Sequence, residues 1–243
     1  MHSSLLAKNG LLNMVAGTDF NFRYQTAGNS IVKDVEKVQE ILNIQPKEIY
    51  TGQQMHGKKV AYADGENGER FVFGKTFKET DGLITDKPGV ALLIKFADCT
   101  PIVLFDPIKK VHASVHSGWR GTTQRIALEA IEKMESDFGC QREDLLVYVG
   151  PSIDQDHYEV GSEVYDAFEG FKERDSFFKP GLKEGKYYLS MLDANLSILK
   201  EAGLKPEQMD IERRSTYTDE SLHSARKEGK NYQLNGLLTM LQE

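Results

Sequence analysis

A cysteine and a histidine stand where two apolar segments give way to polar ones. Cys99 follows the apolar run that ends at Phe96, and His116 follows the run that begins at Val111. Functional side chains are often placed where strands become loops. A thiol and an imidazole can bind a metal ion there, or act as a nucleophile and its base. The alternative for each is a buried structural side chain, since free cysteine is among the most buried residue types.

A second histidine, His56, lies in the polar segment Gln53-Gln54-Met55-His56-Gly57. With Cys99 and His116 it makes two imidazoles and one thiolate, the ligand set expected of a catalytic zinc site with water in the fourth position. The long spacings match no compact zinc motif. The same set binds copper in blue-copper proteins, but six histidines are few for the several centres of a multicopper oxidase. We therefore expect zinc rather than copper.

The segment His116-Ser117-Gly118-Trp119-Arg120-Gly121-Thr122 contains the single tryptophan of the chain. Its glycines indicate a backbone that approaches a ligand closely. Arg120 precedes a predicted helix, and a guanidinium beside a helix N-terminus suits a phosphate. Trp119 either packs in the core or forms a wall for a planar base.

Three helices are expected to position these residues. The first covers residues 31–44 behind Ser30 as N-cap, and the second runs from Thr122 or Thr123 to Phe138, before Gly139. The third follows Ser190 and stops at Gly203.

Short apolar runs rich in β-branched residues predict strands between and after the first two helices. They cover residues 89–98, 101–106, 111–118 and 145–153, and a turn at Asp106-Pro107 joins the middle two as a hairpin. That hairpin brings Cys99 and His116 to the same end. Residues Gly181 to Gly185 are expected to form a loop. Helices mixed with strands predict a single α/β domain over residues 1–243, with a mixed sheet and flanking helices.

Composition excludes several classes of protein. The chain has 243 residues, a net charge of −7, 40% hydrophobic and 28% charged residues, as expected of a globular protein. It has no basic stripe for nucleic acid and no long apolar segment for a membrane, and the pattern of its first residues leads us to expect no secretion. Two cysteines are too few for a disulfide framework, and Cys140 is expected to be structural. We expect a cytoplasmic protein, with a monomer favoured.

Four motifs resemble the YlmD/YfiH-type laccase-domain family, also called polyphenol oxidases. They are QMHG, FADCTP, VHSGWRGT, and GPSI followed by HYEVG. The resemblance implies a fold similar to the catalytic domain of cytotoxic necrotising factor, with zinc held by His56, Cys99 and His116. It also implies phosphorolysis of adenosine, inosine, guanosine and 5′-methylthioadenosine, and hydrolytic deamination of adenosine. The partners are then a purine nucleoside and phosphate.

The resemblance also assigns roles to individual residues. Cys99 and His116 are catalytic residues as well as metal ligands, and Asp98 is a candidate proton shuttle whose alternative is to orient its loop. Substrate binding is assigned to the residues Arg120, Arg226, Gln54 and Arg23. Arg23 is included because residues 14–20 lack the arginine that the family usually has in an early FSTR-like stretch.

Three alternatives remain open at this point. One is a metal-free thiol hydrolase or deamidase, with Cys99 as nucleophile and His116 as base. Another is a copper-dependent phenol oxidoreductase. The third is an interaction protein that kept the fold without turnover.

Overall fold

The computed structural model describes residues 1–242, whose strands form two six-stranded sheets and one three-stranded sheet. The first sheet has the order β1 (Leu11–Ala16), β15 (Asn235–Leu241), β7 (Val90–Phe96), β2 (Glu48–Gly52), β5 (Gly74–Phe77), β4 (Glu69–Phe71). The second has the order β14 (Met209–Ile211), β10 (Leu146–Val149), β8 (Thr100–Asp106), β9 (Val111–Ser117), β6 (Gly82–Thr85), β3 (Val60–Tyr62). The third has the order β11 (Glu159–Gly161), β13 (Lys186–Leu189), β12 (Phe178–Pro180).

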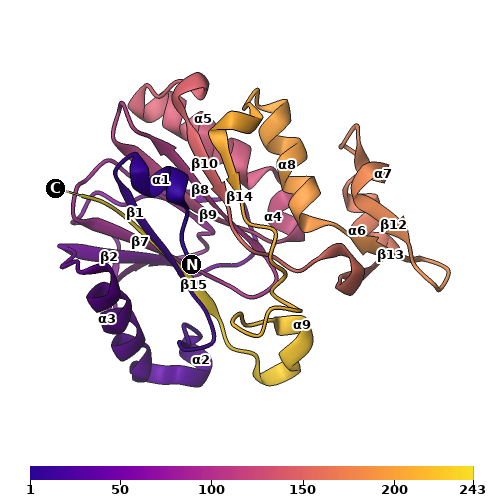
Figure 1. Ribbon diagram of the computed structural model, residues 1–243, viewed down its shortest axis with the longest axis horizontal. Helices are drawn as coiled ribbons and strands as arrows, with labels where there is room; N and C mark the ends of the chain where they lie inside the picture. The colour runs from indigo at the N-terminus through magenta and orange to yellow at the C-terminus, as the bar shows by residue number, and fades with distance from the viewer. Residues whose placement is uncertain (243) are drawn as a thin grey trace.

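Helices cover the outer faces of the two large sheets, which pack against each other (Figure 1). Helix α3 packs on the first sheet, and α5 and α8 pack on the second. The α-helices of the described residues are α1 (Ser4–Lys8), α2 (Tyr24–Ala27), α3 (Ile31–Leu42), α4 (Trp119–Thr123), α5 (Ile126–Phe138), α6 (Ser162–Ala167), α7 (Arg174–Phe177), α8 (Met191–Glu201) and α9 (Ala225–Glu228).

Alternation along β7 shows how the layers are held together. Successive residues of a strand point to opposite faces, so Leu93 packs with Val35 of α3, whereas Phe96 packs with Phe105 of β8 between the sheets. Strand β7 is parallel to β2 and antiparallel to β15. The expectation of an α/β fold with mixed sheets and flanking helices is confirmed.

Two of the predicted helices are confirmed, but one predicted cap is wrong. Helix α8 begins after Ser190, whose Oγ accepts a hydrogen bond from the backbone N–H of Asp193 at 3.2 Å. Helix α3 also begins where expected. Ser30, however, has helical backbone angles and makes no capping bond, because its hydroxyl donates to the carbonyl of Ala27 instead.

The second predicted helix is wrong as a single element. The chain forms α4 over Trp119–Thr123, then breaks at Arg125, whose φ of 60° lies in the left-handed region, before α5 begins at Ile126. Nothing in the residue types announces this break, since arginine is a good helix former. As a result Trp119 and Arg120 lie inside the first helix rather than before it.

The predicted hairpin is confirmed. Strands β8 and β9 pair antiparallel, with Thr100 opposite Ser117 and Pro101 opposite His116. The strand predicted at 145–153 is shorter, ending at Val149. The loop at Gly181 to Gly185 joins β12 to β13, but the small sheet around it was not predicted, because its strands have only three or four residues.

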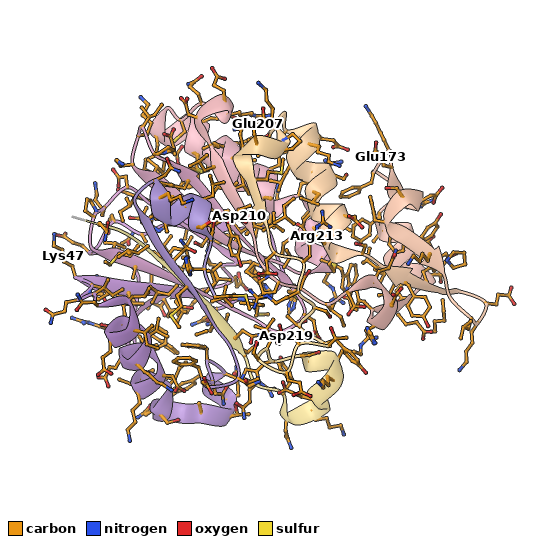
Figure 2. All side chains as sticks on the ribbon, in the orientation of Figure 1. Lys47, Glu173, Glu207, Asp210, Arg213 and Asp219 are labelled. Carbon is orange, nitrogen blue, oxygen red and sulfur yellow. The ribbon has the colours of Figure 1, made fainter. Side chains whose placement is uncertain are left out.

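Charged side chains of both signs surround the molecule, as Figure 2 shows by the nitrogen and oxygen tips along its whole outline. The labelled Lys47 and Glu173 are both exposed examples. Among residues 1–242, no helix has the length and apolar character needed to cross a membrane.

Candidate metal centre

The fold brings together the three side chains whose types and motifs predict metal ligands. His56 lies in the loop after β2, Cys99 lies between β7 and β8, and His116 lies near the end of β9. Their ligand atoms all lie within 4.8 Å of one another. His116 is 4% exposed, whereas His56 is exposed and Cys99 is intermediate.

Cys99 reaches this position because the chain crosses there from one large sheet to the other. Strand β7 belongs to the first sheet and β8 to the second. The tight connection places Asp98 at a φ of 80°, in the left-handed region, where a non-glycine residue is uncommon. The register of the hairpin then places His116 opposite Pro101, two residues from Cys99.

A buried carboxylate holds the loop that contains His56. Asp81 is 0% exposed and accepts hydrogen bonds from the backbone N–H groups of Met55, His56 and Gly57, each at 2.9 Å. These bonds stabilise a loop conformation in which His56 has a φ of 61°. The Asp81 carboxylate therefore fixes the backbone of this loop, and with it the position of the exposed His56.

The same carboxylate orients the second histidine. The Oδ1 atom of Asp81 lies 2.9 Å from Nδ1 of His116, and the backbone N–H of His116 donates to the carbonyl of Asp81 at 2.7 Å. With Nδ1 engaged, Nε2 is the nitrogen left for a metal. Histidine ligands of metal sites commonly donate their other N–H to a carboxylate in this way.

The electrostatics of the cluster favour a thiolate. Burial by itself raises the pKa of Cys99, but the charges and hydrogen bonds of His116 and His56 outweigh it and lower this pKa to about 6. Burial likewise lowers the pKa of His116, and Cys99 and Asp81 reverse this effect and raise it to about 9. Metals are bound by the thiolate form of cysteine.

Gly118 leaves the space in which the cluster packs. A Cβ atom at this position would lie 2.7 Å from Cδ2 of His56 and 2.9 Å from Sγ of Cys99. Its φ of −77° is open to any residue, so the lack of a side chain matters here rather than backbone freedom. Trp119 packs against the core, and its ring lies under the Arg120 guanidinium.

A cavity of about 520 Å³ opens beside the three proposed ligands. One part of its wall is apolar and the other is polar. The apolar part includes Phe22, Tyr24, Phe71 and Leu234, and the polar part includes Arg23, Thr51, Gln53, Gln54, Thr76 and Lys95.

Two of the four proposed substrate-binding residues, Gln54 and Arg23, line this cavity. Each also makes hydrogen bonds to the backbone of the protein. The side-chain amide of Gln54 bonds to the backbone of Lys95, donating to its carbonyl at 2.6 Å and accepting from its N–H at 3.0 Å. The guanidinium of Arg23 donates to the carbonyl of Tyr232 at 2.8 Å and lies over the ring of that residue.

The other two, Arg120 and Arg226, do not line the cavity. The guanidinium of Arg226 lies 5.2 Å from the ring centre of Tyr158, and that of Arg120 lies 4.2 Å from the ring centre of Trp119. Burial raises the pKa of Tyr158, Cys99 raises it further, and both arginines oppose the rise. Tyr158, in the HYEVG motif, therefore contacts Arg226 and does not line the cavity.

Asp98 lies beside Cys99 with both carboxylate oxygens occupied. Oδ1 accepts from the hydroxyl of Thr216 and Oδ2 from the backbone N–H of Arg226, each at 2.7 Å. These two bonds fix the segments that contain Thr216 and Arg226 against the β7–β8 connection, in which Cys99 lies. Its role as a proton shuttle stays a prediction.

Two residues at the site were missed. Asp81 immediately precedes the apolar segment Gly82–Thr85, and Lys95 interrupts the apolar run 89–98. The signal that identifies Lys95 is a charged residue within a segment whose other residues are apolar. No local pattern identifies Asp81, because its partners come from other parts of the chain.

The donor set fits a zinc ion. Zinc in proteins is bound tetrahedrally by nitrogen and sulfur, which places ligand atoms about 3.4–3.6 Å apart. The three ligand atoms here lie within 4.8 Å of one another, a spacing of the same order. Three protein ligands leave the fourth position open, as in catalytic zinc sites.

Comparison with known proteins identifies relatives. Residues 11–239 match the family model described as multi-copper polyphenol oxidoreductase laccase. The purine nucleoside phosphorylase of Bacteroides thetaiotaomicron is 35% identical over 155 residues, covering 61% of this chain and 56% of that protein. The purine nucleoside phosphorylase YlmD of Bacillus subtilis is 28% identical, covering 86% of this chain and 77% of that protein.

Two further matches extend this picture. Adenosine deaminase RL5 from an unknown prokaryotic organism is 35% identical over 62% of this chain and 58% of that protein. The crystal structure of the hypothetical protein YfiH of Bacillus licheniformis superposes with a TM-score of 0.84 at 26% identity, covering 91% of this chain and 85% of that chain. The chain thus spans little more than half the length of several of its curated relatives. It belongs to the multi-copper polyphenol oxidoreductase laccase family, as the match over residues 11–239 shows.

Proposed function

We propose that this protein is a zinc-dependent purine nucleoside enzyme. Its reactions are the phosphorolysis of adenosine, inosine, guanosine and 5′-methylthioadenosine, and the hydrolytic deamination of adenosine. The observation that supports this most directly is the His56, Cys99 and His116 cluster at a cavity of about 520 Å³. The names of the related phosphorylases and of the related deaminase agree with it.

The shape of the cavity suits a nucleoside. Ligand sites are commonly clefts of about 300–1,000 Å³ with apolar walls and a few polar groups. Tyr24 and Phe71 lie with ring centres 5.4 Å apart and offer aromatic surface for a purine. Gln53 and Thr76 line the same cavity, and we assign them to the sugar.

Zinc, when bound, supplies a Lewis acid and lowers the pKa of a bound water. His56, Cys99 and His116 would hold the ion, and Asp81 fixes both the His116 ring and the His56 loop. Charged groups fixed before the reaction stabilise developing charge without reorganisation. The protein therefore contributes to the reaction by holding these ligand side chains in position before the substrate binds.

Zinc is favoured over the copper of the family name by the number of possible sites. Residues 1–242 contain a single group of three or more histidine, cysteine or acidic side chains that could hold a metal. Phenol oxidation by a multicopper enzyme needs several such centres.

A metal-free thiol hydrolase is the second candidate, and one observation favours it. The site offers Cys99 as a nucleophile, His116 as its base and Asp81 as the carboxylate that orients the base. Cysteine enzymes with an activated nucleophile use this arrangement. Removing metal with a chelator separates the candidates. The thiol enzyme keeps its activity, whereas the proposed function requires its loss and its recovery on adding zinc.

The test of the proposed function is an adenosine assay on metal-quantified protein, with and without phosphate, that resolves adenine, inosine and hypoxanthine. Adenine formed only with phosphate supports phosphorolysis, and inosine formed in either condition supports deamination. Absence of turnover with adenosine, inosine, guanosine and 5′-methylthioadenosine by zinc-loaded protein contradicts the proposal and favours an interaction protein.

A further inference from the structure

Lys95 is the one charged residue of β7, a strand whose other residues are all buried. It shares a strand face with Leu93, on the side covered by α3, and it lines the cavity together with Cys99 and His116. Strands buried on both faces are normally apolar throughout. A lysine at this position therefore calls for an explanation.

Among the described residues, the amine of Lys95 makes a single hydrogen bond, and its nearest charge effect comes from Asp81, which it does not contact in an ion pair. Its Nζ donates to the carbonyl of Gly52 at 2.9 Å, and within residues 1–242 it forms no ion pair with a carboxylate. Lys75 on β5, two strands away in the same sheet, is different, because Glu48 lies 3.8 Å from its amine. An ammonium has three N–H groups, so two donors of Lys95 remain free. Burial lowers its pKa to about 8, and the charge of Asp81 opposes this only in part.

Arg23 is the second cation in the cavity wall. Its guanidinium donates through Nη1 to the carbonyls of Tyr232 and Lys230, at 2.8 and 3.2 Å. Those bonds, and the 3.9 Å contact with the ring of Tyr232, fix its position. The described residues give it no carboxylate partner either, and a guanidinium has five N–H donors. Further donors thus remain for a ligand in the cavity.

We propose that Lys95, assisted by Arg23, binds inorganic phosphate in this cavity. The proposal rests on the proposed function, since it assigns the phosphate of phosphorolysis to named residues of the same site. A phosphate accepts charge-assisted hydrogen bonds from both cations and supplies the carboxylate-like partner that neither of them has in the described residues. Because the cavity also reaches Cys99 and His116, a phosphate bound there lies in the same chamber as the nucleoside.

The test is calorimetric titration of zinc-loaded protein with inorganic phosphate. We expect Lys95→Met to weaken phosphate binding by about tenfold or more, because a hydrogen bond to a charged group is lost, and Lys95→Arg to retain most of the affinity. Lys59→Met is the matched control, since the exposed Lys59 also donates to a backbone carbonyl, that of Lys78, at 3.0 Å. Lys95→Gln is a second neutral variant, and thermal unfolding verifies that each protein is folded.

Two results overturn the phosphate site: an equal Kd for wild type and both neutral variants, or no phosphate binding by wild type. Kinetics separate this inference from the proposed function. If nucleosides are cleaved with phosphate but Lys95→Met leaves the KM for phosphate unchanged, the phosphate site is wrong and the function stands. If phosphate binding depends on Lys95 but no nucleoside is cleaved, the function is wrong and the phosphate site stands.

Discussion

The two ends of β9 place histidine in opposite environments. His112 and His116 lie on the same face of the strand, turned toward the other large sheet. His116 bonds to Asp81, and Asp81 and Cys99 raise its pKa above the ordinary value against the effect of burial. His112 is 0% exposed, neither of its ring nitrogens has a partner, and burial lowers its pKa to about 3.

This difference shows that a buried histidine acquires its chemistry from its neighbours. His116 lies near the β7–β8 connection that contains Cys99, and near Asp81, which immediately precedes β6. A metal ion can therefore be bound there. His112 lies between the sheets, where Ser114 bonds to Thr239 of β15, and has neither a charged partner nor access to the cavity. The first is suited to ligand chemistry and the second is held neutral.

The largest expected effect follows from removing the partnered histidine. We expect His116→Ala to lower kcat/KM for nucleosides by more than the roughly 10–100-fold cost of losing an outer-shell partner of a metal site, because it removes a ligand. His112→Leu is the matched variant on the same strand and retains activity. Steady-state assays and metal analysis measure both proteins. Equal activities would show that the two ends of β9 do not differ in function.

Removing the carboxylate has the next largest effect. We expect Asp81→Asn to weaken zinc binding by about 10–100-fold, since His116 loses its anionic partner and the His56 loop loses its anchor. Asp154→Asn is the control, because Asp154 also pairs with a histidine, His157, at 2.7 Å, but outside the cavity. Competition with a chromophoric chelator measures the affinities. Equal losses in both variants would contradict the role given to Asp81.

The smallest effect concerns stability in acid. His112 stays neutral in the folded state, whereas in the unfolded chain it takes up a proton below its ordinary pKa of about 6.5. The unfolded state therefore binds more protons as pH falls from about 6.5 toward 3, and stability is lost over this window.

Between pH 7 and pH 5 this loss amounts to about 2 kcal/mol from His112 alone. We expect His112→Leu to be less sensitive to acid than wild type by this amount, whereas the exposed His2→Gln behaves as wild type. Urea unfolding at the two pH values measures the difference. The same acid sensitivity in wild type and His112→Leu would mean that His112 does not titrate in this way.

The sequence predicted the parts of the site that depend on local pattern. Apolar runs and the Asp106-Pro107 turn placed Cys99 and His116 at one end of a hairpin, and the structure confirms this. His56 was assigned to the ligand set from its motif and from the chemistry of two imidazoles with one thiolate. Its position could not be predicted from local pattern, because its loop is fixed by long-range hydrogen bonds to Asp81.

What could not be predicted depends on contacts between distant segments. The break at Arg125 is a left-handed residue that its type does not favour. Ser30 failed as a cap because the preceding turn already accepts its hydroxyl. Arg120 lies over Trp119 and Arg226 over Tyr158 rather than at the cavity, an outcome of how the segments pack and not of residue type.

The central claim is that His56, Cys99 and His116 hold one metal ion on which nucleoside turnover depends. The most direct measurement is elemental analysis of purified wild type and Cys99→Ala, with adenosine turnover recorded on the same samples. We predict about one zinc per wild-type chain, in accord with a single set of three protein ligands, and loss of both zinc and turnover in the variant. Turnover by protein that contains no zinc would contradict the account.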